Sequence, residues 1–221
     1  MVPRSSPLAT TFIRLRPEWV TVAGMPVPGR FPEDTAARAT ALGICDVSAL
    51  SRAGFKGPGA ANWLAAQGLS IPGVANSWCS TEGGALVARL GRSEFLVEDG
   101  PIGGIATRTR ASLLPGEPGV YPVLRQDCAL ALVGERVGEL FVQTCNVDFG
   151  SQDPAARGAT LTQMVGVGVT VLQAELAGVP CWRIWCDGTM GPYLWETLVG
   201  IAGELGGGPV GLATAFPAWV A

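Results

Sequence analysis

Residues 41–72, ALGICDVSALSRAGFKGPGAANWLAAQGLSIP, contain the pattern that predicts the fold. A short strand is expected at residues 52–56, followed by a Gly-Pro-Gly turn and a helix at residues 60–67. Pro58 suits a first helical turn, because its missing N–H would have no partner there. Gly68 suits the end of the helix, where a left-handed residue closes the last turn. The segment therefore predicts a strand–glycine–helix unit.

The same unit is expected twice more along the chain. In each copy an alternating apolar strand ends near a glycine, and two large apolar residues follow that glycine at offsets of six and seven. The pairs are Trp63 and Leu64 after Gly57, Leu140 and Phe141 after Gly134, and Leu194 and Trp195 after Gly188. These offsets place each pair on the side of a helix that faces the sheet. The pattern predicts an α+β fold of duplicated strand–helix–strand halves, although such matches can also arise by chance among 31 glycines.

Length and composition restrict the class of protein. A chain of 221 residues suits one large domain or two joined halves. Only 15% of its residues are charged, against about 25% in an average chain, so either another subunit covers part of the surface or the many Ala and Gly residues inflate the apolar fraction. The net charge of −3 gives no reason to expect nucleic acid or an anionic membrane as a partner. No segment approaches membrane-spanning length or has the apolar run of a signal peptide, and we expect a cytoplasmic protein.

The residue types present restrict the chemistry. The chain has no histidine, which removes the commonest general base and the commonest metal ligand. Its six cysteines form no CxxC pair, so no metal site is expected. Cysteines scattered in apolar runs usually behave as small core residues. Unpaired cysteines of this kind also fit a reducing cytoplasm. Without a histidine, neither Ser48 nor any cysteine has an evident base to activate it as a nucleophile.

The domain organisation follows from composition and periodicity. Residues 1–32 are rich in Pro and Arg and show no sustained period, so we expect an extended N-terminal arm, with one short strand considered at residues 11–15. Residues 33–221 form the predicted domain, whose halves are joined near residues 114–120, in a loop rich in Pro and Gly. The remaining expected elements are strands at 85–90, 94–97, 121–133, 164–176 and 181–186, and helices at 33–42, 102–113, 138–144 and 192–205.

Several residues invite a functional interpretation, and each also has a structural one. The Gly-Pro-Gly turn precedes a helix, where a phosphate could bind, but it lacks the GxGxxG spacing, and no GxxxxGK[ST] occurs. Five carboxylates adjoin apolar segments and are candidates for buried acids, but a structural role is favoured for all five. They are Asp46, Glu94, Asp127, Asp148 and Asp187. Asp46 and Asp148 are equally good turn residues, whose side chains bond their own backbone. Trp63, Trp182, Trp185 and Trp195 fall on core-facing positions and are expected in the core before any role in stacking on a flavin or pterin.

The segment Gly43-Ile44-Cys45-Asp46-Val47-Ser48 resembles the folate-binding fold of the glycine-cleavage T-protein (aminomethyltransferase). The chain is more similar still to the gamma subunit of heterotetrameric sarcosine oxidase and to the small subunit of N-methylglutamate dehydrogenase. The motifs that carry this resemblance are Arg52-Ala53-Gly54-Phe55-Lys56-Gly57, Leu90-Gly91-Arg92-Ser93-Glu94-Phe95-Leu96 and Cys145-Asn146-Val147-Asp148-Phe149. With the closing Gly208-Pro209-Val210-Gly211-Leu212, they follow the order expected of these families.

The chain departs from the T-protein pattern at the positions that the resemblance assigns to folate. The acidic pair of the T-protein would fall at residues 86–88, its pterin-holding Glu at residues 176–179 and its Ala-Arg-Asp at residues 213–215, and none of these segments contains a charged residue. A pterin presents paired donors, and leaving one buried donor unpaired costs about 1–3 kcal/mol. The resemblance therefore implies a T-protein-like scaffold without the folate chemistry, that is, a pseudoenzyme.

This resemblance implies a non-catalytic structural subunit of a flavin-dependent N-methyl amine oxidoreductase complex, acting on sarcosine or a similar amine. FAD, FMN, NAD and tetrahydrofolate are then expected on partner subunits, with no cofactor in this chain. Residues considered as remnants of the pocket are Asp46, Ser48, Arg52 and Glu94. Partner contacts are expected from the N-terminal arm and from Phe216 and Trp219 in the tail. The alternative is a free-standing folate-binding or one-carbon transfer protein with a rearranged pocket; an iron–sulfur assembly protein is disfavoured, because its Lys-Gly-Cys-Tyr-x-Gly-Gln motif is absent.

Overall fold

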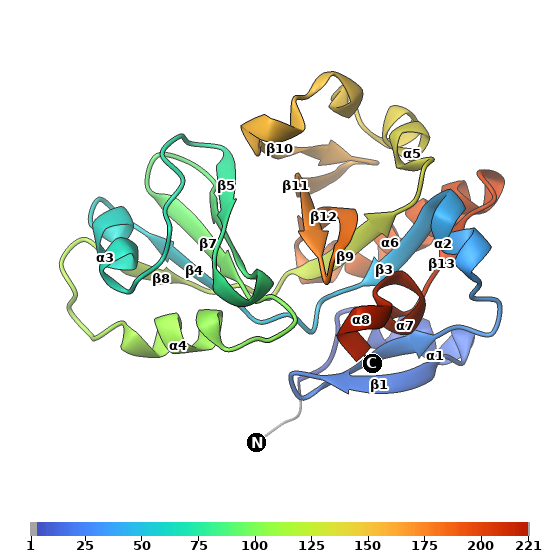
Figure 1. The fold of residues 1–221 in the computed structure, drawn as a ribbon, viewed down its shortest axis with the longest axis horizontal. Coiled ribbons are helices and arrows are strands. Elements are labelled where there is room, and N and C mark those ends of the chain that lie inside the picture. Colours follow the sequence, from blue (N-terminus) through green and yellow to red (C-terminus); the bar gives the residue numbers. More distant parts are fainter. Residues whose placement is uncertain (1–3, 221) are drawn as a thin grey trace. The chain divides into compact units, whose positions relative to one another are not determined.

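The computed structural model describes residues 4–220, which form two compact units (Figure 1). Unit 1 contains the described residues of Met1–Ala49 together with Asp127–Gln152 and those of Thr162–Ala221. Unit 2 contains Leu50–Gln126 and Asp153–Leu161. Each unit is thus assembled from segments that are far apart in the sequence.

A six-stranded sheet in the order β10-β11-β12-β9-β3-β13 organises unit 1, which includes β10 only from Thr162 onward. Neighbouring strands from β11 to β3 are antiparallel, whereas β13 pairs with β3 in parallel. The strands are β3 (Gly43–Asp46), β9 (Cys128–Val133), β10 (Ala159–Met164), β11 (Val167–Leu176), β12 (Val179–Cys186) and β13 (Gly208–Pro209). Strands β9 and β3 are buried along their whole length, so this sheet is the interior of the unit.

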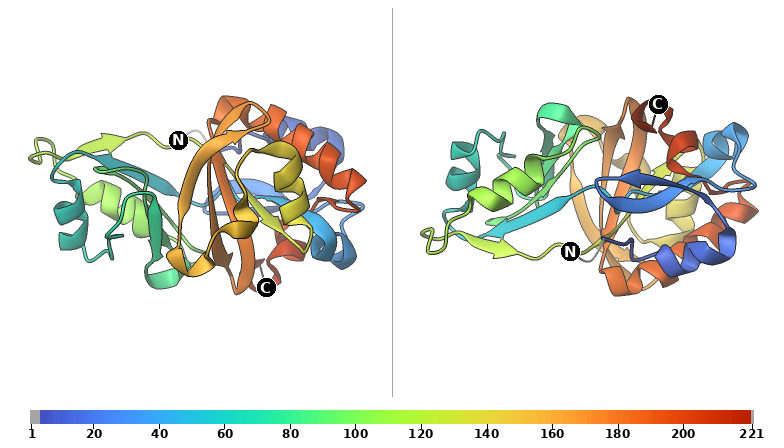
Figure 2. Two further views of the ribbon diagram at one scale, coloured as in Figure 1. Left: turned by 90° about the horizontal axis from the view of Figure 1, so that it is seen from above. Right: turned by 90° about the horizontal axis from the view of Figure 1, so that it is seen from below.

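Several helices of unit 1 pack against one face of this sheet. The helices of unit 1 are α1 (Ala9–Leu15), α2 (Ala36–Leu42), α5 (Val137–Thr144), α6 (Gly191–Glu204), α7 (Leu212–Ala215) and α8 (Pro217–Val220), with short 3-10 turns at Phe149–Ser151 and Gly188–Met190. Helices α5 and α6 lie side by side (Figure 2). Their apolar residues share one core with Ile44, Leu130 and Ile184 of the sheet. Burial of these side chains is the main force that holds the unit together.

The described N-terminal residues, from Arg4 onward, are folded into unit 1. The region expected as an extended arm, 1–32, contains in its described part helix α1 and a hairpin of β1 (Glu18–Val22) and β2 (Met25–Arg30). The strand considered at residues 11–15 is wrong, because this segment belongs to α1. Leu8 and Phe12 are four residues apart and completely buried, and Phe12 packs edge-on against Trp195. This helical spacing is the signal that the proline-rich composition obscured.

Unit 2 is a five-stranded antiparallel sheet in the order β5-β6-β7-β4-β8, with two helices on one face (Figure 1). The strands are β4 (Arg52–Lys56), β5 (Ser77–Ser80), β6 (Leu86–Arg89), β7 (Glu94–Glu98) and β8 (Tyr121–Val123). The helices are α3 (Ala60–Ala66) and α4 (Ile105–Ser112), with 3-10 turns at Glu82–Gly84 and Pro154–Ala156. Phe55 of the sheet stacks obliquely on Trp63 of α3 at 5.2 Å between ring centroids, which anchors that helix.

The strand–glycine–helix pattern is present at all three predicted places. Both members of each bulky pair are buried: Trp63 and Leu64, Leu140 and Phe141, Leu194 and Trp195. Gly57 and Gly134 have φ values of +120° and +106°, which residues other than glycine rarely adopt. One of the three copies lies in unit 2 and two lie in unit 1. The α+β class is confirmed, while the duplication of halves stays a prediction.

Two predicted strands are each divided in the structure. The segment 121–133 supplies β8 to the sheet of unit 2 and β9 to that of unit 1. The segment 164–176 is interrupted at Val165 and Gly166, which both have positive φ and turn the chain from β10 into β11. The loop expected to join the halves, 114–120, lies inside unit 2, and the chain passes between units after Ala49, Gln126, Gln152 and Leu161.

Replacing Gly134 tests whether its backbone conformation supports the fold. A Cβ on Gly134 would lie 2.7 Å from the Ala41 carbonyl oxygen, in addition to the strain at φ +106°. We expect Gly134→Ala to lower the free energy of unfolding by about 2 kcal/mol or more. The control Gly200→Ala, on the exposed side of α6 with open space around it, should raise it by roughly 0.5–1 kcal/mol. Urea denaturation followed by circular dichroism measures the stability of both variants. Equal changes in the two variants would contradict a requirement for glycine at position 134.

Candidate functional site

The most polar part of the core of unit 1 surrounds Asp46, at the end of β3. The Asp46 side chain is only 3% exposed. Its Oδ2 accepts a hydrogen bond of 2.5 Å from the Ser6 hydroxyl, and its Oδ1 accepts one of 2.9 Å from the Ser48 N–H. The Ser6 Oγ in turn accepts from the Leu8 N–H at the start of α1, at 3.1 Å. The buried carboxylate thus fixes the beginning of α1 to the end of β3.

Ser48 links the segment after β3 to β9. Its Oγ accepts a hydrogen bond of 3.0 Å from the Ala129 N–H and lies 3.4 Å from the Ala129 carbonyl oxygen, to which the hydroxyl can donate. The neighbouring Val47 N–H donates to the same carbonyl at 2.9 Å. This hydroxyl extends the pairing of two strands, so the geometry gives Ser48 a structural role.

Cys128 and Cys186 lie beside this network, opposite one another on β9 and β12. Both thiols are buried, with exposures of 0% and 4%. The hydrogen bond that the Cys128 thiol donates lowers the pKa of Cys186. That bond and burial raise the pKa of Cys128, and the charge of Asp46 raises it further.

In unit 2 the structure separates the two remaining candidates. Arg52 forms an ion pair of 3.0 Å with Glu98, and both side chains are almost completely buried. Glu94 lies 3.9 Å from Arg125 and is 45% exposed. In the register of β4 and β7, Arg52 faces Glu98 whereas Glu94 faces Lys56, at the other end of β4. Arg52 and Glu94 therefore do not meet in a common site.

Two acids of unit 2 were missed by the sequence reasoning. Glu98 is the partner of Arg52, and Asp99 accepts hydrogen bonds from the Gly104 and Ala106 N–H groups at 3.0 and 2.7 Å. Asp99 thus ties down the first turn of α4, where a carboxylate is also favoured by the helix dipole. The only signal in the sequence is the run of acids at the end of an apolar strand, which indicates burial without naming partners.

The positions that the T-protein resemblance assigns to folate contain ordinary structural residues. Leu86, Val87 and Ala88 are buried in β6. Ala177 and Gly178 form the turn between β11 and β12, with positive φ at both residues. Residues 213–215 belong to α7. At these three places the chain offers no carboxylate that could pair with the donors of a pterin.

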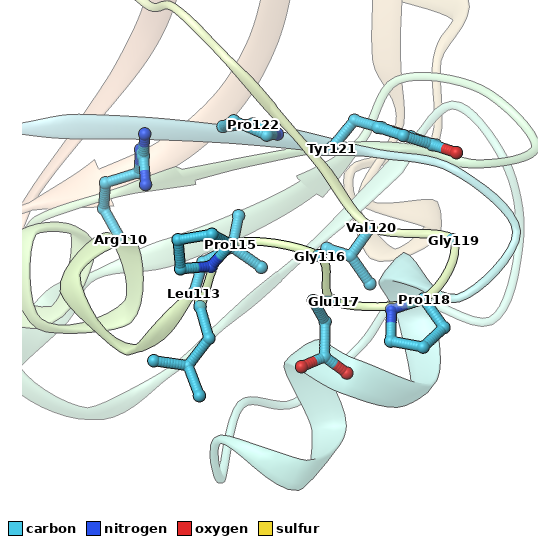
Figure 3. Close-up of a pocket in the computed structure, with 11 residues that line it drawn as sticks. Arg110, Leu113, Pro115, Gly116, Glu117, Pro118, Gly119, Val120, Tyr121 and Pro122 are labelled. Carbon is cyan, nitrogen blue, oxygen red and sulfur yellow. The ribbon is translucent and has the colours of Figure 1, made fainter.

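A cavity of about 450 Å³ opens beside the loop that follows α4 (Figure 3). Arg110, Glu117 and Tyr121 supply its polar side chains, and their polar ends point in different directions. A second cavity of about 630 Å³ is lined by residues 71–79 and 155–158. There the Arg157 guanidinium lies over the Trp78 ring at 5.2 Å. Binding sites for small molecules combine an apolar wall with convergent polar groups, and neither cavity shows that convergence.

Phe216 and Trp219, the two predicted contact residues of the tail, differ in their exposure. Phe216 is completely buried, so its ring offers no surface to a partner in this structure. Trp219 is half-buried and packs edge-on against Phe216, at 6.4 Å between ring centroids. Phe216 was expected to contact a partner, but its ring is buried within the protein.

Three further observations concern metal sites, disulfides and membrane-spanning helices. Among residues 4–220, no group of three or more His, Cys, Asp or Glu side chains is arranged to hold a metal ion. The six cysteines are free thiols. No helix in the described part of the chain combines the length and apolar character needed to cross a membrane.

Comparing two aspartates tests whether burial makes Asp46 essential for stability. Asp46 and Asp148 both accept a hydrogen bond from the N–H two residues later, at 2.9 and 3.0 Å, but only Asp46 is buried. Asp46→Asn should lower the free energy of unfolding by about 1–3 kcal/mol, because the charged acceptor of the Ser6 hydroxyl is lost. Asp148→Asn should change it by less than about 0.5 kcal/mol. Thermal and urea denaturation measure the stability of both variants. If Asp46→Asn leaves the free energy of unfolding unchanged, the network contributes nothing to stability.

Comparison with known proteins relates this fold to solved structures. No protein-family model matches the chain, and no curated protein matches its sequence. The glycine cleavage system aminomethyltransferase T from Bartonella henselae superposes with a TM-score of 0.69 at 18% identity, over 96% of this chain and 60% of that one. The heterotetrameric sarcosine oxidase from Corynebacterium sp. U-96, in complex with pyrrole 2-carboxylate, superposes with a TM-score of 0.62 at 21% identity, over 94% of this chain and 98% of the matched chain. The chain, which spans 60% of the length of the T-protein, has the fold of these two structures.

Proposed function

We propose that this protein is a non-catalytic structural subunit of a flavin-dependent N-methyl amine oxidoreductase, of the gamma type found in sarcosine oxidase and N-methylglutamate dehydrogenase. The observation that carries the proposal is the mutual coverage with the sarcosine oxidase chain, 94% of this chain and 98% of that one. A likeness that extends over both chains favours an equivalent subunit over a shared module. That solved enzyme is a heterotetramer, which supports a place for this chain in a complex of unlike subunits.

The state of the candidate residues supports a structural role. Asp46, Ser48 and Arg52 each have internal partners in the fold. A carboxylate or hydroxyl already bonded to the backbone would have to lose those bonds before it could bind a ligand, and each lost bond to a buried group costs about 1–3 kcal/mol. The polar groups of the fold therefore stabilise it and leave little capacity for chemistry.

In the proposed complex the cofactors reside on other subunits. FAD, FMN, NAD and tetrahydrofolate would be held by partners, and the amine oxidised would be sarcosine or a similar N-methylated amine in the cytoplasm. This chain would cover and fix those subunits. Its low fraction of charged residues, 15%, favours such a covering role, because subunit interfaces are depleted of charge at their centres.

The proposed contact surface includes the N-terminal region and the tail. Ile13 on α1 is 68% exposed and Trp19 on β1 is 44% exposed. Trp219 offers a half-buried ring on α8. In the proposed complex a partner subunit would cover these apolar side chains.

Co-purification from the native host tests the proposed complex. We expect the tagged chain to bring down unlike subunits with flavin absorbance and sarcosine- or N-methylglutamate-oxidising activity. Ile13→Asp should reduce their recovery at least about tenfold, because it places a charge in an apolar contact. The control Ile102→Asp, at a residue of unit 2 that is 85% exposed, should leave recovery unchanged. Recovery of the chain alone, without flavin or unlike subunits, would refute the proposal.

A free-standing folate-binding or one-carbon transfer protein is the second candidate. The higher TM-score with the T-protein, 0.69 against 0.62, favours it. Titration of the isolated chain with tetrahydrofolate, followed by calorimetry, distinguishes the two. We expect no saturable binding in the micromolar range, because the segments assigned to the pterin lack carboxylates. Micromolar binding would favour the folate protein and would contradict the scaffold role.

A further inference from the structure

We propose that Cys128 and Cys186 form a reversible disulfide when the protein meets a peroxide, which makes this pair a redox modification site in unit 1. The inference does not depend on the proposed function. It rests on strand register, on the face of the sheet that the two side chains share and on the surroundings of the thiols.

The register of the sheet places the two cysteines directly opposite one another. Cys186 of β12 is the partner of Cys128 of β9, as the last pair of that antiparallel ladder. Directly opposed residues of antiparallel strands have Cα atoms about 4.5–5.5 Å apart. Disulfides join residues whose Cα atoms are about 4.4–6.8 Å apart. The backbone therefore already meets the distance requirement for a bond.

Both side chains point to the same face of the sheet. Cys128 and Cys186 belong to the core cluster that α1, α5 and α6 cover. The interaction between the two thiols shifts their pKa values in opposite directions, down for Cys186 and up for Cys128. The paired register and this mutual influence place the two thiols beside one another in the reduced protein.

The first residue of α6 makes room for the pair. A Cβ placed on Gly191 would lie 2.9 Å from the Cys128 Cβ and 3.0 Å from its Sγ. A glycine at this position therefore lets the thiol of Cys128 lie against the helix without displacing it. The charge of Asp46 raises the pKa of Cys128, and the charges of Asp127 and Asp187 act to raise that of Cys186.

The reaction follows from which thiol ionises first. Cys186 has the lowered pKa, so its thiolate attacks one oxygen of hydrogen peroxide, the O–O bond breaks, and a sulfenic acid and hydroxide form. The Cys128 sulfur then attacks the Cys186 sulfur, the S–S bond forms, the S–O bond breaks, and the proton of Cys128 leaves with the hydroxyl group as water. Two thiols and one peroxide give one disulfide and two waters. A dithiol reductant reverses the step.

Cys45 and Cys181 supply an internal control. They lie on β3 and β12 of the same sheet and are 1% and 3% exposed. Strand β9 runs between β3 and β12, which puts their backbones about 9–10 Å apart at the usual strand spacing. A disulfide cannot span more than about 7 Å between Cα atoms without backbone movement. Burial is similar in the two pairs, but only Cys128 and Cys186 lie opposite one another on neighbouring strands.

The experiment uses the full chain with Cys79→Ser and Cys145→Ser, because these two thiols are the more exposed ones. The reduced protein is treated with hydrogen peroxide, with and without urea below the unfolding transition so that access is not limiting. It is then denatured, alkylated and digested without reduction for mass spectrometry. Two of the four remaining thiols should be lost, with a linked Cys128–Cys186 peptide that dithiothreitol cleaves. Cys45 and Cys181 should be recovered alkylated.

Single variants test the order of the steps. Cys128→Ser should stop at a sulfenic acid on Cys186, detected as its dimedone adduct, and Cys186→Ser should leave Cys128 unoxidised. Intact thiols at both positions after peroxide in urea would overturn the proposal. A Cys45–Cys181 link, or Cys186 oxidised to sulfinic acid in the parent without a linked peptide, would overturn it as well. Because the linked peptide is sought in the parent chain, the result does not depend on the folding of either single variant.

Discussion

The pairing of β9 with β3 on one side and β12 on the other is the constraint on which unit 1 depends. These strands come from residues 43–46, 128–133 and 179–186. Segment Leu50–Gln126 of unit 2 lies in sequence between β3 and β9, and segment Asp153–Leu161 lies between β9 and β12. Every residue of β9 is buried, and its backbone groups must be satisfied by these two neighbours because water does not reach them. The registers of these two ladders determine where Asp46 lies. They also place Ser48 against Ala129 and Cys128 opposite Cys186.

Buried polar groups show how the fold uses its few charges. Asp46 and Asp99 each bind the beginning of a helix, α1 through Ser6 and α4 through two backbone N–H groups. Arg52 and Glu98 neutralise one another inside unit 2. Removing a charge from water is costly unless partners replace the lost hydration. A chain with 15% charged residues that commits several of them to internal contacts has correspondingly few for substrate chemistry.

Local patterns predicted much of the fold, because they depend on neighbours in sequence. The strand Arg52–Lys56 was predicted with its correct bounds, and the glycines after β4 and β9 do have positive φ. The N-terminal helix was missed because prolines and arginines hide the spacing of Leu8 and Phe12. The segment 121–133 was predicted as one strand because β-propensity does not reveal which sheet each part joins.

The site was less predictable, since its members meet only through tertiary contacts. Asp46 was correctly interpreted as a turn residue that bonds its own backbone, which is a local property. Nothing near Arg52 in sequence indicates Glu98, 46 residues away, and nothing near Cys128 indicates Cys186. Phe216 was predicted as a partner contact because an aromatic residue in an apolar tail can be either exposed or buried, and the structure buries it completely. Register and burial are global quantities, so these contacts required the structure.

The low identity to the two solved structures is consistent with the way this fold is maintained. Its architecture requires glycine where the chain turns from β4 or β9 toward a helix, and bulky apolar pairs six and seven residues later. Such requirements fix few positions and leave the rest free to vary, so a superposition with a TM-score of 0.69 can persist at 18% identity. Ligand-binding residues are a separate requirement that the scaffold does not impose. A chain can therefore lose the side chains that grip a cofactor and keep the fold, provided that the polar groups left behind find partners within it. Asp46, whose two oxygens bond to Ser6 and Ser48, meets that condition.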